Sequence, residues 1–268
     1  MDTDKALTGS VPKIYDTYLV PLIFEPFADD LLRRLAPRAP RRVLEVAAGT
    51  GAVTRRMAAV LPERTSIVAT DLNQAMLDQA AASGTPRPVE WRHADALQLP
   101  FEDGSFDAVV CQFGAMFFPD KARAFAEARR VLKPGGAFLF NVWDAIEHNA
   151  FADTITNALA LLFPDDPPRF LARTPYGYND VSTIQRDLQG GGFKTAKLTT
   201  VTAPSRAASP HVPAIGYCQG TPLRGEIEAR KPDGLAEATD LAAEAVAKRF
   251  GRSDLESENQ AHVIEANR

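Results

Sequence analysis

Three acidic side chains stand where extended apolar runs of the chain come to an end. Glu45 lies in the first of these runs, Asp71 closes the run 66–71, and Asp95 follows the run 89–93. A carboxylate accepts hydrogen bonds from hydroxyl and amino groups. If the three runs form parallel strands, the acids lie along one edge of the sheet, where doubly wound folds bind ligands. We therefore expect a ligand site at that edge.

A glycine turn follows the first acid. Gly49 and Gly51 stand in G-x-G spacing, and apolar residues at helical spacing resume over 52–61. The segment therefore predicts a strand, a tight turn and a helix. Glycine lets backbone approach a ligand closely, so a unit of this kind suits a nucleotide-like ligand.

Two cofactors are bound by turns of this kind. A dinucleotide turn reads G-x-G-x-x-G, and Thr54 stands where its third glycine or alanine belongs. An S-adenosylmethionine turn reads as an acid followed by G-x-G-x-G. Glu45, Gly49 and Gly51 match that pattern, and Ala47 replaces its first glycine. An alanine adds only a methyl group there if the local φ is negative.

Strands and helices alternate through the middle of the chain and continue more loosely after it. The predicted strands are 42–45, 66–71, 89–93, 106–111, 137–142, 195–201 and 261–266. The predicted helices are 27–35, 51–61, 73–80, 121–132, 147–163, 180–188 and 235–250. Repeated units of this length imply an α/β fold with a doubly wound, parallel sheet.

Composition narrows the possible partners. The 268 residues are 45% hydrophobic and carry a net charge of −4, which indicates ample core and disfavours a nucleic-acid partner. No apolar run approaches the roughly 18–20 residues that span a bilayer, and Met1–Thr8 lacks the features of a signal peptide. Cys111 and Cys218 have no metal-ligand spacing. We expect a cytoplasmic protein with no membrane partner and no metal.

The chain resembles class I S-adenosylmethionine-dependent methyltransferases, in particular the methyltransferase type 11 group that includes ubiquinone and menaquinone biosynthesis enzymes. The matching segments are 43–54, 68–77, 93–101, 106–112 and 131–136. The resemblance implies a seven-stranded, mostly parallel sheet whose last strand is antiparallel. With it we predict an N-terminal helical cap (1–36), a cofactor-binding core (37–142), and a remainder of the same domain (143–268) that holds substrate-side insertions and the closing strands.

The resemblance also implies S-adenosyl-L-methionine as cofactor and gives roles to individual positions. Glu45 would orient the methionine amino group, Asp71 would hold the ribose, and Asp95 would read the adenine edge. Tyr18 would close the site from the N-terminal segment. The expected cofactor-binding residues are Tyr18, Glu45, Ala47, Gly49, Gly51, Asp71, Leu72, Met76, Asp95, Ala96 and Gln112.

Methyl transfer from a sulfonium is an in-line displacement, so the protein mainly aligns the acceptor and excludes water. A base is needed only for a poorly acidic hydroxyl or a protonated amine. His148 and His211 are the candidate bases. The run Gln112–Phe118 stands where methyltransferases acting on nucleic-acid amino groups carry Asn/Asp-Pro-Pro-Tyr/Phe, which favours a small organic acceptor with apolar surface.

Two other functions compete with this hypothesis. A catalytically idle cofactor-binding module, acting as a sensor or partner subunit, would bind S-adenosylmethionine without an acceptor pocket. A nicotinamide oxidoreductase would use the same kind of turn, and Thr54 argues against it. The oligomeric state is open, with a homodimer as one option.

Overall fold

The computed structural model describes residues 9–268. In that part of the chain, seven strands form one sheet in the order β3-β2-β1-β4-β5-β7-β6. The strands are β1 (Arg42–Val46), β2 (Ser66–Asp71), β3 (Glu90–His93), β4 (Phe106–Gln112), β5 (Leu132–Trp143), β6 (Ala196–Ala207) and β7 (Leu255–Asn267). Strands β1 to β5 pair in parallel, and β7 runs antiparallel to β5. The predicted fold class is confirmed.

Helices connect the strands. They are α1 (Val11–Ile14), α2 (Glu25–Leu35), α3 (Ala52–Val60), α4 (Gln74–Ser83), α5 (Lys121–Val131), α6 (Ala150–Leu162), α7 (Phe170–Arg173), α8 (Val181–Gly190), α9 (His211–Gln219), α10 (Leu223–Arg230) and α11 (Leu235–Phe250). A π-helix, η2 (Tyr15–Phe24), joins α1 to α2, and the 3₁₀ turns are η3 (Ala36–Arg38), η4 (Ala115–Phe117) and η5 (Ile146–His148). None of the helices in residues 9–268 is both long and apolar enough to cross a membrane.

The described chain divides into two compact units. Unit 1 comprises residues 9–25, 144–177 and 202–260, and unit 2 comprises residues 26–143, 178–201 and 261–268. Strands β6 and β7 therefore each contribute residues to both units. The division into a cap, a core and a remainder stays a prediction.

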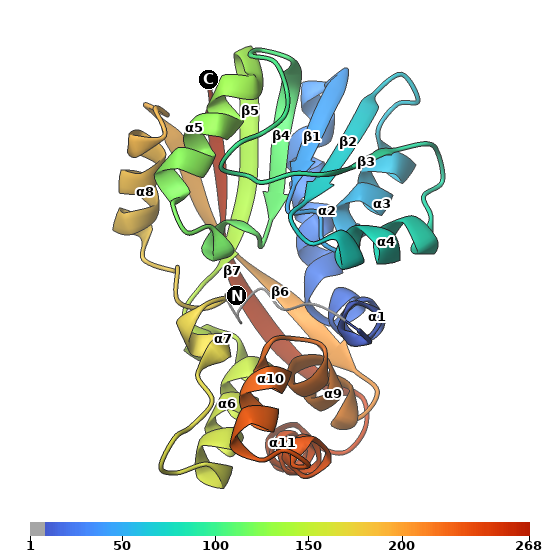
Figure 1. The fold of residues 1–268 in the computed structure, drawn as a ribbon, viewed down its shortest axis with the longest axis vertical. Coiled ribbons are helices and arrows are strands. Elements are labelled where there is room, and N and C mark those ends of the chain that lie inside the picture. The colour runs from blue at the N-terminus through green and yellow to red at the C-terminus, as the bar shows by residue number, and fades with distance from the viewer. Residues whose placement is uncertain (1–8) are drawn as a thin grey trace. The chain divides into compact units, whose positions relative to one another are not determined.

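Unit 2 contains the doubly wound core (Figure 1). On one face of the sheet, α2 and α3 bury Leu31, Leu32 and Met57 against strand residues such as Val43. On the other face, Phe125 of α5 contacts Phe138 and Phe140 of β5, with ring centroids 5.6 and 5.1 Å apart. Helix α8 packs beside α5. Burial on both faces explains why the central strands read as continuous apolar runs.

Unit 1 is mainly helical. Helix α11 packs against α6 and α9 (Figure 1), and the rings of Phe151 and Phe250 meet at 4.9 Å. Helix α9 also packs on η2, where a Cβ at Gly216 would come within 2.9 Å of Leu19. The hydroxyls of Tyr176 and Tyr217 lie 3.2 Å apart in this interior.

Four predicted elements have wrong bounds. Strand β5 begins at Leu132, so the residues between the predicted helix 121–132 and the predicted strand 137–142 lie inside the strand, next to an irregularity in the β4–β5 register. The predicted helix 147–163 starts as η5, and α6 begins after Asn149, whose side chain bonds the backbone of Ala145 and Gln260. Strands β6 and β7 are longer than predicted. The predicted strands are too short because buried positions of these strands hold small or polar residues, among them Ser205 and Asn259.

Candidate cofactor site

The turn between β1 and α3 uses left-handed backbone at every second residue. The φ angles are +55° at Ala47, +56° at Gly49 and +82° at Gly51. The negative φ under which an alanine would cost only a methyl group is not observed at Ala47, and an alanine in left-handed backbone costs about 1–2 kcal/mol. Its methyl group fits because the facing residue is Gly114, where a Cβ would lie 2.5 Å from the Cβ of Ala47.

The end of β2 braces this turn. Asp71 accepts the N–H of Gly49 through Oδ2 and the N–H of Asn73 through Oδ1, both at 2.8 Å. The preceding residue, Thr70, donates its hydroxyl to the carbonyl of Glu45 and accepts the N–H of Ala48. Burial raises the pKa of Asp71, and the two backbone N–H groups oppose that rise. The turn is thus held by β2 through side chain and backbone.

Glu45 lies at the carboxyl end of β1 and is 1% exposed. Its Oε2 accepts the hydroxyl of Thr54 at 2.5 Å, which ties the strand to the first turn of α3. Burial raises the pKa of Glu45 to about 8, and the charge of Asp71 adds to the rise. The Thr54 hydrogen bond and the Arg55 charge act in the opposite direction. This carboxyl group is therefore poised between its two protonation states near neutral pH.

The polar groups around the turn favour one kind of ligand. A pyrophosphate site needs N–H groups that point at the ligand. Here the N–H of Gly49 is bonded to Asp71 and the N–H of Gly51 to the carbonyl of Ala48. The carboxyl groups of Glu45 and Asp71 flank the turn, and each would repel an anion in its ionised form. They fit the ammonium group and ribose hydroxyls of S-adenosylmethionine instead.

The loops after β2 and β3 are tied together at the same sheet edge. The N–H of Ala94 donates to the carbonyl of Asp71 at 3.0 Å, and Nε2 of His93 lies 2.8 Å from the carbonyl oxygen of Leu72. Leu72 is 49% exposed, as an apolar residue that covers a ligand ring would be. Asp95 is also exposed and accepts the N–H of Leu97.

Two other predicted residues of this edge are buried. Met76, in the first turn of α4, places its Cε 3.6 Å from where a Cβ on Gly49 would stand. The side chain of Ala96 is also buried. The cofactor contacts of both residues stay predictions.

The loop after β4 is fixed by one buried amide. Asn141 of β5 accepts the N–H of Phe113 at 3.0 Å and approaches Oε1 of Gln112 at 3.5 Å. Phe113 has a φ of +49° and stacks on Trp143 with ring centroids 3.6 Å apart. A bulky residue in left-handed backbone marks strain that its surroundings must hold, and such strain clusters at functional sites.

The remaining predicted residues belong to unit 1. Tyr18 is half-buried in η2. His148 ends η5 and is exposed, and His211 begins α9, with its Nε2 3.6 Å from Oδ1 of Asp240. The acids and glycines of the turn all belong to unit 2. The roles of Tyr18, His148 and His211 therefore stay predictions.

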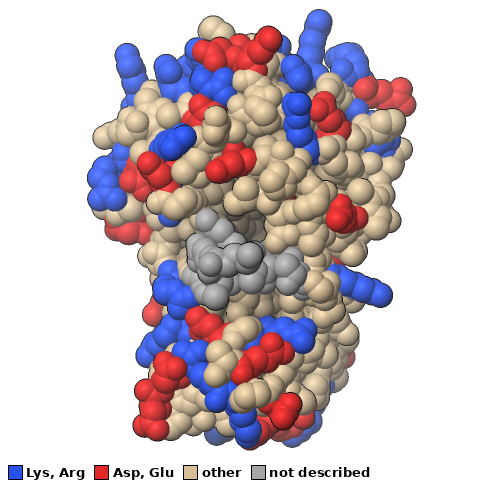
Figure 2. Space-filling model, in the orientation of Figure 1, with Lys and Arg blue, Asp and Glu red and all other residues tan. Residues whose placement is uncertain are grey.

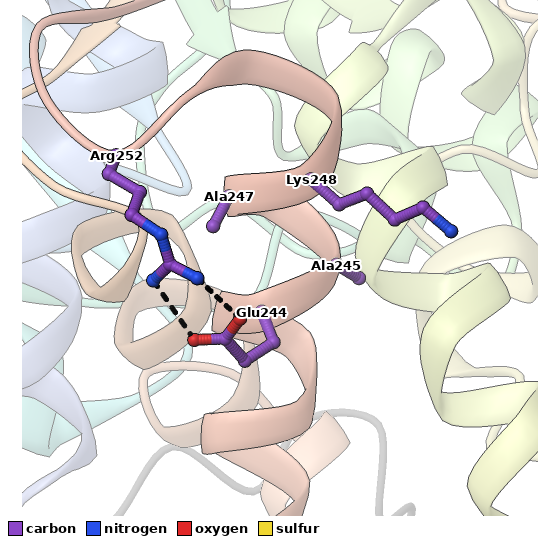
Figure 3. A pocket seen from close by; sticks show the side chains of 5 residues that line it. All are labelled: Glu244, Ala245, Ala247, Lys248 and Arg252. Carbon is purple, nitrogen blue, oxygen red and sulfur yellow. Dashed lines mark hydrogen bonds and ion pairs between the residues drawn. The ribbon is translucent and has the colours of Figure 1, made fainter.

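Other features of the described chain do not resemble a reactive site. A hollow on α11 is lined by Glu244, Ala245, Ala247, Lys248 and Arg252 (Figure 3). Arg252 pairs with Glu244 there, with N–O distances of 3.1 and 3.3 Å, so the two charges satisfy each other. Within residues 9–268, no group of three His, Cys, Asp or Glu side chains is arranged to hold a metal. Basic and acidic side chains are intermixed on the face shown in Figure 2.

Sequence reasoning missed the residues that hold the site rather than line it. Thr54 entered only as a mismatch to the dinucleotide pattern, yet its hydroxyl bonds Glu45. Thr70 and Asn141 lie within the predicted strands 66–71 and 137–142 and have no predicted role, although both are buried and form hydrogen bonds with backbone of the site. Polar residues at buried strand positions were the available signal, since such groups need partners.

Comparisons with known proteins agree with this geometry. The family model described as a methyltransferase domain matches residues 44–140. The ubiquinone/menaquinone biosynthesis C-methyltransferase UbiE of Saccharophagus degradans is 30% identical over 178 residues, which cover 62% of this chain and 72% of that protein. The demethylmenaquinone methyltransferase of Clavibacter sepedonicus is 30% identical over 182 residues, covering 64% and 73%.

Solved structures show the same fold. A methyltransferase of Bacillus halodurans, described as putative, has a TM-score of 0.57 at 23% identity and covers 90% of this chain and 97% of its own. Phosphoethanolamine N-methyltransferase 2 of Haemonchus contortus, in complex with S-adenosyl-L-methionine, has a TM-score of 0.62 at 17% identity and covers 99% and 58%. The chain belongs to the class I S-adenosylmethionine-dependent methyltransferases and uses S-adenosylmethionine as its cofactor.

Proposed function

We propose that this methyltransferase acts on a small organic acceptor with apolar surface, and that a ring-hydroxylated aromatic of the quinol class is the first acceptor to test. The names of the two relatives support the proposal, because one is a C-methyltransferase of ubiquinone and menaquinone biosynthesis and the other a demethylmenaquinone methyltransferase. The aromatic run after β4 supports an apolar acceptor. Carbon methylation of a quinol ring is the reaction that these observations favour.

The cofactor roles of individual residues belong to the same proposal. Glu45 would accept the ammonium group of the cofactor, and Asp71 would accept hydroxyl protons of its ribose. Hydrogen bonds already hold both groups in place: Glu45 is bonded by the hydroxyl of Thr54, and Asp71 by the backbone N–H groups of Gly49 and Asn73. These hydrogen bonds are the observation that supports the assignments, because a carboxylate that is already held in place loses little conformational freedom when it binds a ligand.

When bound, S-adenosylmethionine supplies a methyl group already activated by its sulfonium sulfur. The chain then has two tasks, which are to orient the acceptor and to exclude water. Gln112 ends β4, the central strand of the sheet, and Phe113 follows it; Asn141 holds both residues in place. A base is required only if the acceptor hydroxyl must be ionised, and His148 and His211 remain the candidates for that step.

An acceptor screen tests the proposal. The full chain is incubated with S-adenosylmethionine carrying a deuterated methyl group and with benzene and naphthalene hydroquinones, aliphatic amines and thiols. Mass spectrometry then locates the label. A labelled ring carbon on a hydroquinone is the expected result. Label on an amine or thiol alone would contradict the quinol class.

The idle module gives a different result in the same experiment. It predicts that S-adenosylhomocysteine binds in a titration while no acceptor in any class gains the label. A matched reaction with Asp71→Ala controls for label that arrives without the cofactor site.

A further inference from the structure

We propose that Thr54 is a positioning residue for the cofactor, which acts by holding Glu45 with one carboxylate oxygen bonded and the other directed to the ligand. The inference rests on the role of Glu45 proposed above. Thr54 itself would not touch the cofactor.

The geometry of Thr54 is that of a brace. It is the third residue of α3 and is 0% exposed. Its hydroxyl reaches across the glycine turn to Oε2 of Glu45, the last acid of β1, at 2.5 Å. A short hydrogen bond to an ionised oxygen is stronger than one between neutral groups.

The residue type at this position is itself informative. A fully buried place on the core side of α3 suits an apolar side chain, as Val53 and Met57 of the same helix illustrate. Valine has nearly the shape of threonine and would bury no hydroxyl. The hydroxyl of Thr54 is therefore explained by the hydrogen bond that it donates to Glu45.

The charges that face Glu45 explain why a donor is needed. Asp71 on β2 raises the pKa of Glu45, while Arg55 on α3 lowers it. Cys111 on the neighbouring strand β4 also interacts with Glu45, and burial keeps this thiol in its neutral form by raising its pKa to about 12. The Thr54 hydroxyl is thus a neutral donor that favours the ionised carboxylate against burial and Asp71.

A consequence for binding follows from linkage. Only the ionised carboxylate attracts an ammonium group, so affinity for the cofactor rises with pH until Glu45 is ionised in the free protein. Removing the Thr54 hydroxyl raises the pKa of Glu45, so the affinity reaches its plateau at a higher pH. The ammonium group of the ligand also titrates, but it does so equally for every variant, so differences between variants report the protein.

The test compares Thr54→Val with Thr54→Ser. Binding of S-adenosylhomocysteine is measured by isothermal titration calorimetry from about pH 6 to about pH 9. We expect Thr54→Val to bind about tenfold more weakly near neutral pH, with the loss shrinking at the alkaline end. Thr54→Ser keeps the hydroxyl, and its affinity should stay within about threefold of the parent protein.

A second background isolates the pair. In Glu45→Gln the carboxylate is absent, so adding Thr54→Val should change affinity by less than about twofold and leave its pH dependence unchanged. Thermal unfolding of each variant, with Thr54→Ala as the alternative if Thr54→Val fails to fold, checks that the proteins are native. A pH-independent loss that is equal in both backgrounds would overturn the proposal, as would unchanged affinity in Thr54→Val.

The same titrations separate this inference from the role of Glu45. If Glu45→Gln binds as well as the parent protein, the proposed contact between Glu45 and the ammonium group is wrong. If Glu45→Gln binds weakly but Thr54→Val binds normally, only the positioning role of Thr54 is wrong.

Discussion

At the scale of single residues, Asp71 carries more than the one role expected of it. The sequence pattern marks it as a ribose acceptor, and the structure adds that its two oxygens hold the N–H groups of Gly49 and Asn73. A carboxylate has about four acceptor positions, so these bonds leave room for hydroxyl groups of a ligand. Loss of Asp71 should therefore affect both the ligand and the turn.

Replacing Asp71 with Ala should weaken S-adenosylhomocysteine binding by about 1–3 kcal/mol, because hydrogen bonds to a charged acceptor are lost. Titration calorimetry measures the loss, and chemical denaturation should show a lower free energy of unfolding as well. Asp78→Ala is the matched control, since Asp78 lies exposed on α4 and bonds only Gln74 among the contacts the structure describes for it. Unchanged affinity in Asp71→Ala would mean that the ribose assignment is wrong.

Glu45 gives a prediction for pH. Its pKa rises from an ordinary value of 4.5 to about 8 in the folded protein, so between these values the folded state keeps a proton that the unfolded state has lost. The free energy of unfolding contributed by Glu45 therefore falls as pH increases through this window. The glutamine of the Glu45→Gln variant cannot ionise. Between pH 6 and pH 8, which lie within about two units of the folded pKa, the free energy of unfolding of this variant should therefore decline less than that of the parent protein.

Chemical denaturation at the two pH values measures that difference. Since every other titrating group is common to both proteins, the difference between the two declines belongs to Glu45 and its neighbours. Identical declines would show that Glu45 ionises at its ordinary value despite its burial.

At the scale of elements, the turn after β1 packs against the loop after β4 because Gly114 of that loop has no side chain. Ala47 is left-handed, and its methyl group occupies the space that a side chain at Gly114 would need. The same Cβ at Gly114 would also come within 2.9 Å of Sγ of Cys111. The alanine in place of the usual glycine is thus accommodated by a glycine in the facing loop.

A double-mutant cycle tests this fit. Gly114→Ala should lower the free energy of unfolding by about 1–3 kcal/mol through overpacking. Ala47→Gly should be neutral or stabilising by up to about 1 kcal/mol, because glycine adopts a positive φ at no steric cost. In the double variant, Ala47→Gly should relieve part of the Gly114→Ala penalty, with a coupling of at least about 0.5 kcal/mol. Additive effects in denaturation experiments would show that the two methyl groups do not compete.

The elements also show where sequence reasoning succeeds and where it fails. The predicted bounds of β2 and α11 agree with the structure, and the predicted start of α8 lies one residue from the observed one, where the side chain of Asp180 accepts the N–H of Thr183. The space for the methyl group of Ala47 could not be predicted, because it depends on Gly114, which lies far along the chain. The full lengths of β6 and β7 could not be predicted either, because the small and polar residues at their buried positions do not form an alternating apolar pattern.

At the scale of the whole molecule, the predicted cofactor-binding acids and the candidate bases lie in different units. The matched family model covers residues 44–140, which all lie in unit 2 and include the predicted acids from Glu45 to Asp95. The candidate bases lie in unit 1. A sequence can therefore identify the methyl donor from a compact set of strand ends, whereas the candidate bases lie outside the region that the family model matches.

We expect the β1–α3 turn, with Glu45 and Asp71, to bind S-adenosylmethionine and to disfavour an anionic dinucleotide. Titration of the full chain with S-adenosylhomocysteine, repeated with NADH present in excess, tests it most directly. We predict saturable one-site binding of S-adenosylhomocysteine that NADH does not displace and that Asp71→Ala weakens. An absence of binding at high micromolar S-adenosylhomocysteine, or its displacement by NADH, would contradict the account.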